Sequence, residues 1–317
     1  MATASSPRRL VRRCGASRWK GAGIVARLGL VGVNTSHAEA FARVFNGTGE
    51  QPPEIEGGKI VALWGDDRAR ADLLAEVYGI PTVVAEPASM VEDIDAVLIV
   101  DDTGGGATHA DLARPYLTAG VPTFIDKPMT LHYEDAVALF DLAARHDAPL
   151  MSCSALRYAA ELTDLRVRLP DLGALSSVVS TSPGDWYYYG VHAVEQLVAV
   201  LGTGATWVHR HAFPQRDIAV IGYEDGPTAI VQTLRDAGYL FQLTCYGEHG
   251  WDRTEIEDVD GFYRATIAAV LRMIATGRAP IKREETLEIL AILHAGLRSA
   301  ETGAPVELAT IQGQRER

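Results

Sequence analysis

Cysteine is scarce in this sequence, and long apolar runs are absent. The 317 residues include three cysteines, Cys14, Cys153 and Cys245, whose positions show no paired spacing. This usage argues against a disulfide framework and fits buried thiols in a reducing compartment. No apolar run approaches the roughly 18 residues that a membrane helix needs. We therefore expect a cytoplasmic protein that does not bind membranes, and its length is enough for about two domains.

Acidic residues are missing from the start of the chain. The first 27 residues hold seven of the 29 basic residues and none of the 41 acidic residues, so the rest of the chain is strongly acidic. An acidic body repels a phosphate backbone, which excludes nucleic acid as an expected partner. The basic residues 1–26 are compatible with a transit peptide, but we interpret them as a disordered tail and leave them out of the fold.

The remaining chain shows two patterns of apolar residues. From residue 27 to about residue 150, runs that are apolar at nearly every position, such as LGLVGV and AVLIV, alternate with segments of helical spacing. Strands buried on both faces and covered by helices give this pattern, so residues 27–150 are predicted to form a doubly wound parallel sheet of the Rossmann type. Residues 151–317 contain longer strands joined by turns, as in TAIVQTLRDAGYLFQLTCYG. They predict a second α/β domain with a large open, mainly antiparallel sheet.

The turn after the first predicted strand lacks two of the glycines that a dinucleotide-binding loop normally has. In a GxGxxG turn the second glycine lets the backbone approach a pyrophosphate, and the third allows close helix packing. In LGLVGVNTSHAEAF only Gly32 is in place, with Asn34 and His37 at the other two positions. Asn34, Thr35 and Ser36 are capping residues that leave helix N–H groups free for an anion. The expected cofactor contacts in this turn are Gly32, Asn34, Thr35, Ser36 and His37. Phosphate binding, and simple helix capping with His37 packed on the helix, both fit this pattern.

Acidic residues follow the second predicted strand one position later than usual. The acid that accepts hydrogen bonds from the adenosine ribose normally ends this strand. Here Trp64 and Gly65 precede Asp66 and Asp67. An acid at this place repels a 2′-phosphate, so we expect NAD rather than NADP as the cofactor. A plain turn into the next helix is the alternative interpretation.

More polar residues follow the later strands of the predicted parallel sheet. Ligands bind outside the carboxyl ends of such strands. The further expected cofactor contacts are therefore Asp102, Thr103, His109, Asp126 and Lys127. A metal site could use the same acids with a histidine, but no HxH or HxxxH spacing supports one, and we expect no metal.

Lys127 is the most informative single residue. It directly follows the strand-like FID and precedes a proline that biases it toward extended geometry. At the mouth of a pocket, a lysine can hold a negative charge or carry a proton. A surface lysine is the ordinary alternative.

The segment FIDKPMT resembles the EKP segment of the Gfo/Idh/MocA oxidoreductase family, with Asp126 in place of the glutamate. Further motifs follow the family's order between Arg27 and Leu308, including RLGLVGV, DAVLIV, SALRYAAEL and YYGVHAVEQLVAVLG. The resemblance implies an NAD(P)-dependent oxidoreductase that transfers hydride between nicotinamide and a secondary alcohol or ketone of a sugar-like or cyclitol-like molecule. It also implies a homodimer or homotetramer formed through the open sheet, and a reacting oxygen that accepts a hydrogen bond from Lys127.

The resemblance also points to catalytic residues in the second half. The family's DxGxH pattern aligns with YYGVH, where Gly190 and His192 match and Tyr188 replaces the aspartate. Lys127, His192 and Tyr188 are thus the expected catalytic residues. His192 suits proton transfer near neutral pH, whereas Tyr188 needs a neighbouring cation such as Lys127 to lose its proton. If this segment is helical, Glu195 lies on the same face as His192 and can orient it.

Several alternatives stay open at this point. Arg157 and Tyr189 join Lys127, Tyr188, His192 and Glu195 as expected substrate contacts. A salt bridge between domains is an equal alternative for Arg157, and the aromatic run 186–189 could equally form a wall on which a sugar stacks. For the whole chain, the alternatives are a lyase, epimerase or glycosidase that uses a retained NAD, and a non-catalytic binding or regulatory protein that kept the fold.

Overall fold

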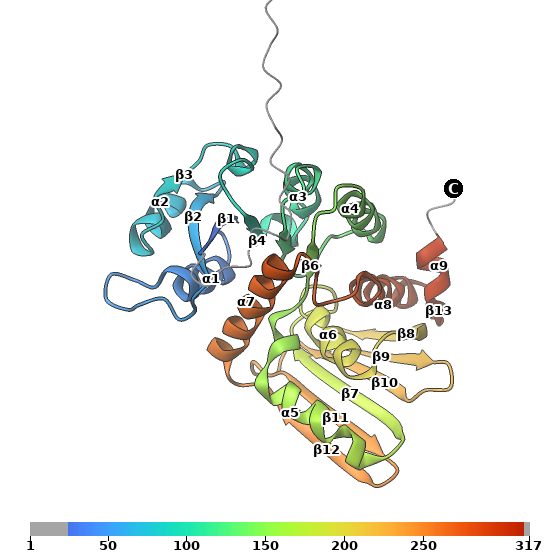
Figure 1. The fold of residues 1–317 in the computed structure, drawn as a ribbon. Helices are drawn as coiled ribbons and strands as arrows, with labels where there is room; N and C mark the ends of the chain where they lie inside the picture. The colour runs from blue at the N-terminus through green and yellow to red at the C-terminus, as the bar shows by residue number, and fades with distance from the viewer. Residues whose placement is uncertain (1–24, 314–317) are drawn as a thin grey trace, which may run out of the picture.

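The computed structural model describes residues 25–313 and contains two sheets, each with its own helices (Figure 1). Nearly all of the predicted tail, residues 1–26, therefore lies outside the described residues. The first sheet has six strands in the order β3-β2-β1-β4-β5-β6, and every pairing is parallel. Its strands are β1 (Ala26–Val31), β2 (Gly58–Trp64), β3 (Thr82–Val83), β4 (Ala96–Ile99), β5 (Thr123–Ile125) and β6 (Leu150–Ser152). Its helices are α1 (Ser36–Asn46), α2 (Arg68–Val77), η2 (Pro87–Met90), η3 (Thr103–Gly105), α3 (His109–Thr118) and α4 (Tyr133–Arg145).

Strands β1 and β4 lie at the centre of this sheet because apolar side chains fill both of their faces. All four residues of β4 are buried, and only Arg27 is exposed in β1. Helix α1 buries Phe41 and Phe45 on the side that faces the sheet, as its apolar spacing requires. The predicted doubly wound parallel sheet is confirmed.

The second sheet has seven strands in the order β12-β11-β7-β10-β9-β8-β13. Its strands are β7 (Leu175–Pro183), β8 (Ala205–Phe213), β9 (Arg216–Tyr223), β10 (Thr228–Leu234), β11 (Gln242–Gly247), β12 (Gly250–Glu255) and β13 (Val306–Glu307). Its helices are η4 (Ala155–Tyr158), α5 (Ala160–Arg168), η5 (Leu169–Leu172), α6 (Gly190–Leu201), α7 (Val259–Thr276), α8 (Arg283–Thr302) and α9 (Leu308–Gln312). The predicted α/β domain with a mainly antiparallel sheet is therefore confirmed.

One detail of this sheet differs from the sequence-based expectation. Strands β10 and β11, which flank the segment RDAGYLF, do not pair with each other. They lie on either side of β7, which is parallel to β10 and antiparallel to β11. The turn-like residues between β10 and β11 carry the chain across the end of β7, so the sheet is mixed.

Helix α7 joins the two halves of the molecule. Helices α6 and α8 pack on one face of the second sheet, whereas α7 contacts both α1 and η4 (Figure 1). The other face of the second sheet is open, and there the paired Tyr246 and Trp251 are exposed. Among residues 25–313, no helix combines the length and apolar character needed to cross a bilayer.

Candidate active site

A cavity of about 120 Å³ lies where the carboxyl ends of the parallel strands meet the second domain. The first half of the chain contributes Thr35, Ser36, His37 and Lys127. The second half contributes Ser154, Ala155, Leu156, Tyr188, Tyr189, His192, Tyr239, Phe241, Phe262 and Tyr263. The lining thus combines a polar side, which holds Lys127 and two histidines, with an aromatic side.

The turn between β1 and α1 keeps two features of a phosphate-binding loop. Gly32 has a φ of 106°, and a Cβ there would lie 2.4 Å from the backbone nitrogen of Asp101, so only glycine fits. Thr35 caps α1 by accepting a hydrogen bond from the His37 N–H at 3.2 Å. Because the first turn of a helix has unpaired N–H groups and a positive dipole end, residues 34–36 fit the phosphates of a dinucleotide.

Asn34 occupies the place of the second glycine and uses its side chain to join two strand ends. Its Oδ1 accepts a hydrogen bond from the Asp102 N–H at 2.8 Å, and its Nδ2 donates to Thr103 Oγ1 at 3.0 Å. The amide therefore connects the turn after β1 to the turn after β4, at the point where the strand order reverses. Asp102 and Thr103 therefore contact the turn after β1 through Asn34.

The acids after β2 have different surroundings. Asp67 is the N-cap of α2 and accepts a hydrogen bond from the Arg70 N–H at 3.1 Å, which is the turn that the alternative interpretation described. Asp66 is exposed beside it and accepts only the N–H of Asp67 among the described residues. Asp66 is thus the acid that remains available for a ribose.

His109 was expected to contact the cofactor, but the structure gives it another position. The side chain is buried, with Nε2 2.6 Å from the Asp101 carbonyl oxygen and Nδ1 3.0 Å from that of Pro128. It is not part of the cavity lining. Both ring nitrogens face backbone carbonyl groups, so His109 ties the turn after β4 to the turn after β5.

Asp126 and Lys127 follow β5 and diverge in role. Lys127 lines the cavity although only 7% of it is exposed, and its Nζ lies 4.2 Å from the centroid of the Tyr188 ring. Asp126 is buried, and its Oδ2 lies 2.7 Å from Nδ1 of His37. Burial alone would raise the pKa of Asp126, but the charge and hydrogen bond of His37, with Lys127 nearby, lower that pKa to about 2.

Asp126 should therefore stabilise the folded protein near neutral pH and lose this effect in acid. Its folded-state pKa of about 2 lies below the ordinary value of 3.8. The contribution of Asp126 to the unfolding free energy is therefore complete at pH values above 3.8, and it disappears as the pH falls toward 2. This difference of nearly two pKa units corresponds to roughly 2 kcal/mol of unfolding free energy. Urea unfolding of the wild type and of Asp126→Asn, at pH 7 and at pH 3, measures this contribution to the unfolding free energy. A stability difference that does not shrink at the lower pH would contradict this expectation.

Tyr188 is not placed to accept a proton. Its hydroxyl donates to the carboxylate of Asp102, at 2.9 and 3.0 Å from the two oxygens. Burial and this carboxylate raise the pKa of Tyr188 above its ordinary value. Lys127 lies over the ring face and not beside the hydroxyl. The expected activation of Tyr188 by Lys127 is therefore corrected: Tyr188 links the two halves of the molecule and covers Lys127.

Tyr188→Phe should accordingly lower turnover by less than about tenfold. The variant keeps the ring over Lys127 and loses only the hydrogen bond to Asp102, which is worth roughly 1.5–3 kcal/mol for a charged partner. Steady-state kinetics with Tyr188→Ala as the second variant separates the two roles, because only Tyr188→Ala uncovers Lys127. A fall of 100-fold or more in Tyr188→Phe would make the hydroxyl a proton carrier after all.

His192 lines the cavity from α6. Its Nδ1 lies 2.6 Å from Oγ of Ser154, which follows β6. Burial, with Lys127 and His37 nearby, holds the pKa of His192 well below 6.5, so the ring is neutral at physiological pH. A neutral imidazole can exchange hydrogen bonds with a hydroxyl or carbonyl oxygen of a bound molecule.

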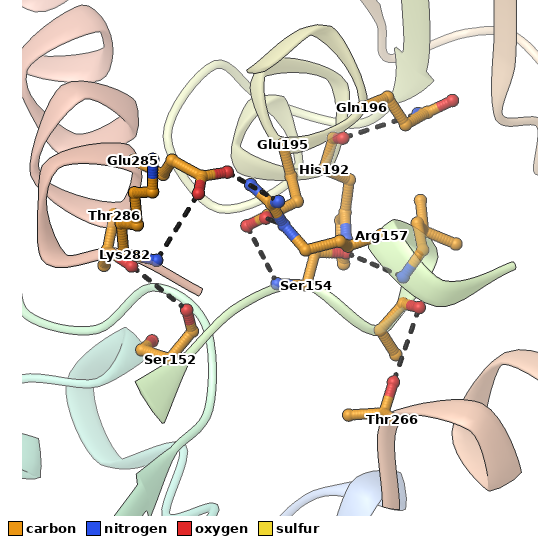
Figure 2. Close-up of polar contacts among 12 residues, drawn as sticks. Ser152, Ser154, Arg157, His192, Glu195, Gln196, Thr266, Lys282, Glu285 and Thr286 are labelled. Atoms are coloured by element: carbon orange, nitrogen blue, oxygen red, sulfur yellow. Dashed lines mark hydrogen bonds and ion pairs between the residues drawn. The ribbon is translucent and has the colours of Figure 1, made fainter. Parts of the chain in front are cut away.

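Arg157 and Glu195 were expected to contact substrate, and Glu195 to orient His192, but neither residue lines the cavity. Figure 2 shows Glu195 bound to Nε of Arg157 through one oxygen and to the Ser154 N–H, at 3.1 Å, through the other. A second ion pair of 2.8 Å joins Arg157 to Glu285 of α8. Arg157 therefore forms salt bridges, as the alternative interpretation held, but its partners lie in the second domain and not across the two domains. The residue that contacts His192 is Ser154 and not Glu195.

Seven lining residues were not among the expected site residues: Ser154, Ala155, Leu156, Tyr239, Phe241, Phe262 and Tyr263. Ser154 could have been, because it follows β6 at the same edge as Lys127 follows β5. Tyr239, Phe241, Phe262 and Tyr263 carry no such signal, since they reach the cavity from the loop after β10 and from α7. Tyr189, which the sequence indicated, does line the cavity. Within residues 25–313, no three His, Cys, Asp or Glu side chains converge as metal ligands.

Comparisons with known proteins agree with this architecture. Residues 26–153 match a family model described as GFO_IDH_MocA, oxidoreductase family, NAD-binding Rossmann fold. The chain is 28% identical over 301 residues to D-xylose 1-dehydrogenase (NADP(+)) 2 of Haloferax volcanii, covering 78% of this chain and 91% of that protein. It is 35% identical over 101 residues to myo-inositol dehydrogenase Hyg17 of Streptomyces leeuwenhoekii, covering 32% and 30% of the two chains.

A solved structure shows the same fold over most of the chain. The probable dehydrogenase from Thermotoga maritima superposes with a TM-score of 0.79 at 15% identity, covering 90% of this chain and 99% of that one. The parallel sheet and the family match define an oxidoreductase with an NAD-binding Rossmann domain. Residues 26–153 thus match the model of the Gfo/Idh/MocA family, the family that the motifs of the chain resemble.

Proposed function

We propose that this protein transfers hydride between a nicotinamide dinucleotide and a secondary alcohol or ketone of a sugar-like or cyclitol-like molecule. The observation that carries the proposal is the buried amino group of Lys127, which lines a cavity closed by the second domain and lies near neutral His192. Two relatives whose names give sugar or inositol dehydrogenase activity support the substrate class. By the same resemblance we propose a homodimer or homotetramer formed through the open sheet.

The residues present fit the dinucleotide. Gly32 allows the tight turn between β1 and α1, the first turn of α1 offers N–H groups to phosphate, and Asp66 can accept hydrogen bonds from a ribose. When bound, the cofactor supplies the group that gives or takes hydride. Lys127 then donates a hydrogen bond to the reacting oxygen, where negative charge develops.

The aromatic side of the cavity fits the carbon face of a ring-shaped substrate. Tyr189, Phe241 and Tyr263 come from three different elements and line the same space. Apolar C–H faces pack on aromatic rings, while hydroxyl groups of a sugar or cyclitol would face Ser154 and His192 on the polar side.

Isothermal calorimetry with NAD⁺ and NADP⁺, followed by a panel of sugars and cyclitols, tests the function. We expect a dinucleotide to bind and a member of the panel to produce reduced nicotinamide. Absence of binding by either dinucleotide at millimolar concentration would overturn the proposal. Turnover without added cofactor and without net reduction would indicate a non-redox enzyme with a retained cofactor.

NAD⁺ should bind more tightly than NADP⁺, by roughly tenfold, because two carboxylates end β2. Asp66 and Asp67 are exposed there, and a unit charge at about 4 Å costs roughly 1 kcal/mol even in water. Asp66→Ser should narrow the ratio of the two dissociation constants by weakening NAD⁺ and relieving NADP⁺. Exposed Asp72, which lies further along α2, provides the matched control Asp72→Ser. Equal affinities in the wild type would contradict the preference.

A further inference from the structure

A close contact joins the side chains of His37 and Asp126 at the cavity, and the proposed function does not use it. His37 belongs to the first turn of α1 and lines the cavity, whereas Asp126 follows β5 immediately before Lys127. Their atoms Nδ1 and Oδ2 are 2.7 Å apart, with 14% and 10% of the side chains exposed. The Tyr263 ring packs edge-on against the imidazole, with centroids 5.3 Å apart. The His37 ring is thus held in one orientation by a carboxylate and an aromatic ring.

An imidazole held in this way has its two nitrogens in different roles. A carboxylate that accepts the Nδ1–H fixes the tautomer in which Nε2 carries no proton, and it stabilises the imidazolium that forms when Nε2 takes one. Asp126 is suited to this because its carboxylate stays ionised over the whole neutral range. Since Asp126 engages Nδ1, Nε2 is the nitrogen of His37 left for a molecule in the cavity.

The other side chains at the cavity leave this role open. Tyr188 replaces the aspartate of the family pattern, and its hydroxyl donates to Asp102 instead of accepting a proton. His192 contacts a serine hydroxyl, and no carboxylate of residues 25–313 is hydrogen-bonded to its ring. Lys127 donates to the reacting oxygen in the proposed function. A proton leaving the substrate therefore needs another acceptor, and His37 is a cavity histidine whose ring contacts a carboxylate.

We propose that His37, oriented by Asp126, is the proton acceptor and donor of this site, replacing the aspartate that position 188 lacks. The inference rests on the proposed function. In the oxidising direction, the substrate O–H bond breaks and its proton goes to Nε2 of His37. The electron pair of that bond forms the C=O double bond as the carbon's hydrogen leaves as hydride, with its electron pair, to the nicotinamide dinucleotide. The imidazolium beside Asp126 then returns its proton to solvent.

Nitrogen NMR of the cofactor-free protein tests the arrangement without any turnover. Long-range ¹H–¹⁵N spectra distinguish the two imidazole tautomers, and the His37 signals are those that His37→Gln removes. We expect the neutral ring of His37 to carry its proton on Nδ1, with Nε2 unprotonated, and Asp126→Asn to reduce the population of this tautomer. A ring protonated on Nε2 in the wild type would overturn the proposal.

Chemical rescue tests the reaction itself. His37→Ala should lower turnover by roughly 100-fold or more, the range of general acid–base catalysis, while dinucleotide affinity changes by less than about twofold. Added imidazole should restore a large part of the activity with saturation, which a merely structural role would not produce. Asp126→Asn should also lower turnover, because the amide can hold the ring in the other tautomer. Exposed His146, at the end of α4, provides the control His146→Gln, which should match the wild type.

The outcomes separate this inference from the proposed function. Full activity of His37→Ala, or a loss that imidazole does not rescue, overturns the role of His37 while Lys127 and the oxidoreductase activity stand. A wild type that binds neither NAD⁺ nor NADP⁺ overturns both proposals together. Calorimetry on His37→Ala confirms that the variant is folded and binds cofactor before its turnover is interpreted.

Discussion

Replacing Lys127 with methionine is expected to lower turnover by roughly 100- to 1,000-fold, as loss of one donor to a developing oxyanion does. Methionine has nearly the length of lysine and keeps the apolar stem in its buried position, so the variant should fold. The dinucleotide dissociation constant should change little, because the phosphates lie at the first turn of α1 in the proposed complex. Steady-state kinetics and calorimetry on the same preparation measure both quantities.

The matched control for this variant is Lys59→Met. Lys59 lies exposed on β2, outside the cavity, so its loss should leave turnover unchanged within about twofold. Activity of Lys127→Met close to the wild type would remove Lys127 from the reaction. A loss confined to KM, with kcat retained, would assign it to substrate binding alone.

Arg157→Met is expected to have the largest effect on stability, about 3–5 kcal/mol, the usual cost of removing one partner of a buried ion pair. Arg157 is 9% exposed and Glu195 is 2% exposed, so methionine would leave a buried carboxylate without its cation. Burial lowers the pKa of Arg157, but Glu195 and Glu285 outweigh that effect and raise it, so the guanidinium is charged throughout. Urea unfolding of wild type and variant gives the difference.

Two further variants show whether the cost comes from the unpaired charge. Adding Glu195→Met to Arg157→Met should recover part of the lost stability, because a pair of apolar side chains of similar size is often as stable as the ion pair it replaces. Arg68→Met removes a pair with Asp72 whose side chains are 59% and 54% exposed, and should cost less than about 1 kcal/mol. Equal losses in Arg157→Met and Arg68→Met would contradict this account.

The ion pairs of Arg157 with Glu195 and Glu285 also explain why Ser154 faces His192. Glu195 accepts the Ser154 N–H, and Arg157 and Glu285 hold Glu195 in turn (Figure 2). The sequence shows Glu195 three residues after His192, from which a direct contact was expected. In the structure Glu195 does not contact His192 directly. It accepts the backbone N–H of Ser154, whose hydroxyl contacts His192, because the chain after β6 passes between α6 and α8.

Much of the fold follows from local patterns. Short runs that are apolar at nearly every position are typical of strands buried on both faces, and they predicted the doubly wound parallel sheet, which has six strands in the structure. The mixed order of the second sheet was not predictable in the same way. The insertion of β7 between β10 and β11 pairs segments about 50 to 70 residues apart, and strand alternation carries no information about which distant strand is the neighbour.

For the candidate site, the positions of some residues were predictable from the sequence, but their contacts were not. Gly32, Asp66 and Lys127 could be located from the sequence, because each lies directly after a strand and all parallel strands end at one edge of their sheet. Which side chains then meet was not predictable: Asp126 with His37, Asn34 with Thr103, and Tyr188 with Asp102 are pairs separated by 69 to 89 residues.

By itself, the sequence determined the resemblance to the Gfo/Idh/MocA family, the parallel sheet and the edge at which polar side chains gather, since these depend on residue order and on short-range spacing. Only the tertiary structure decided what each side chain does there. Partner choice depends on how the second domain and α7 pack against the strand ends, and that packing turns Tyr188 toward Asp102, Arg157 toward two carboxylates and His37 toward Asp126.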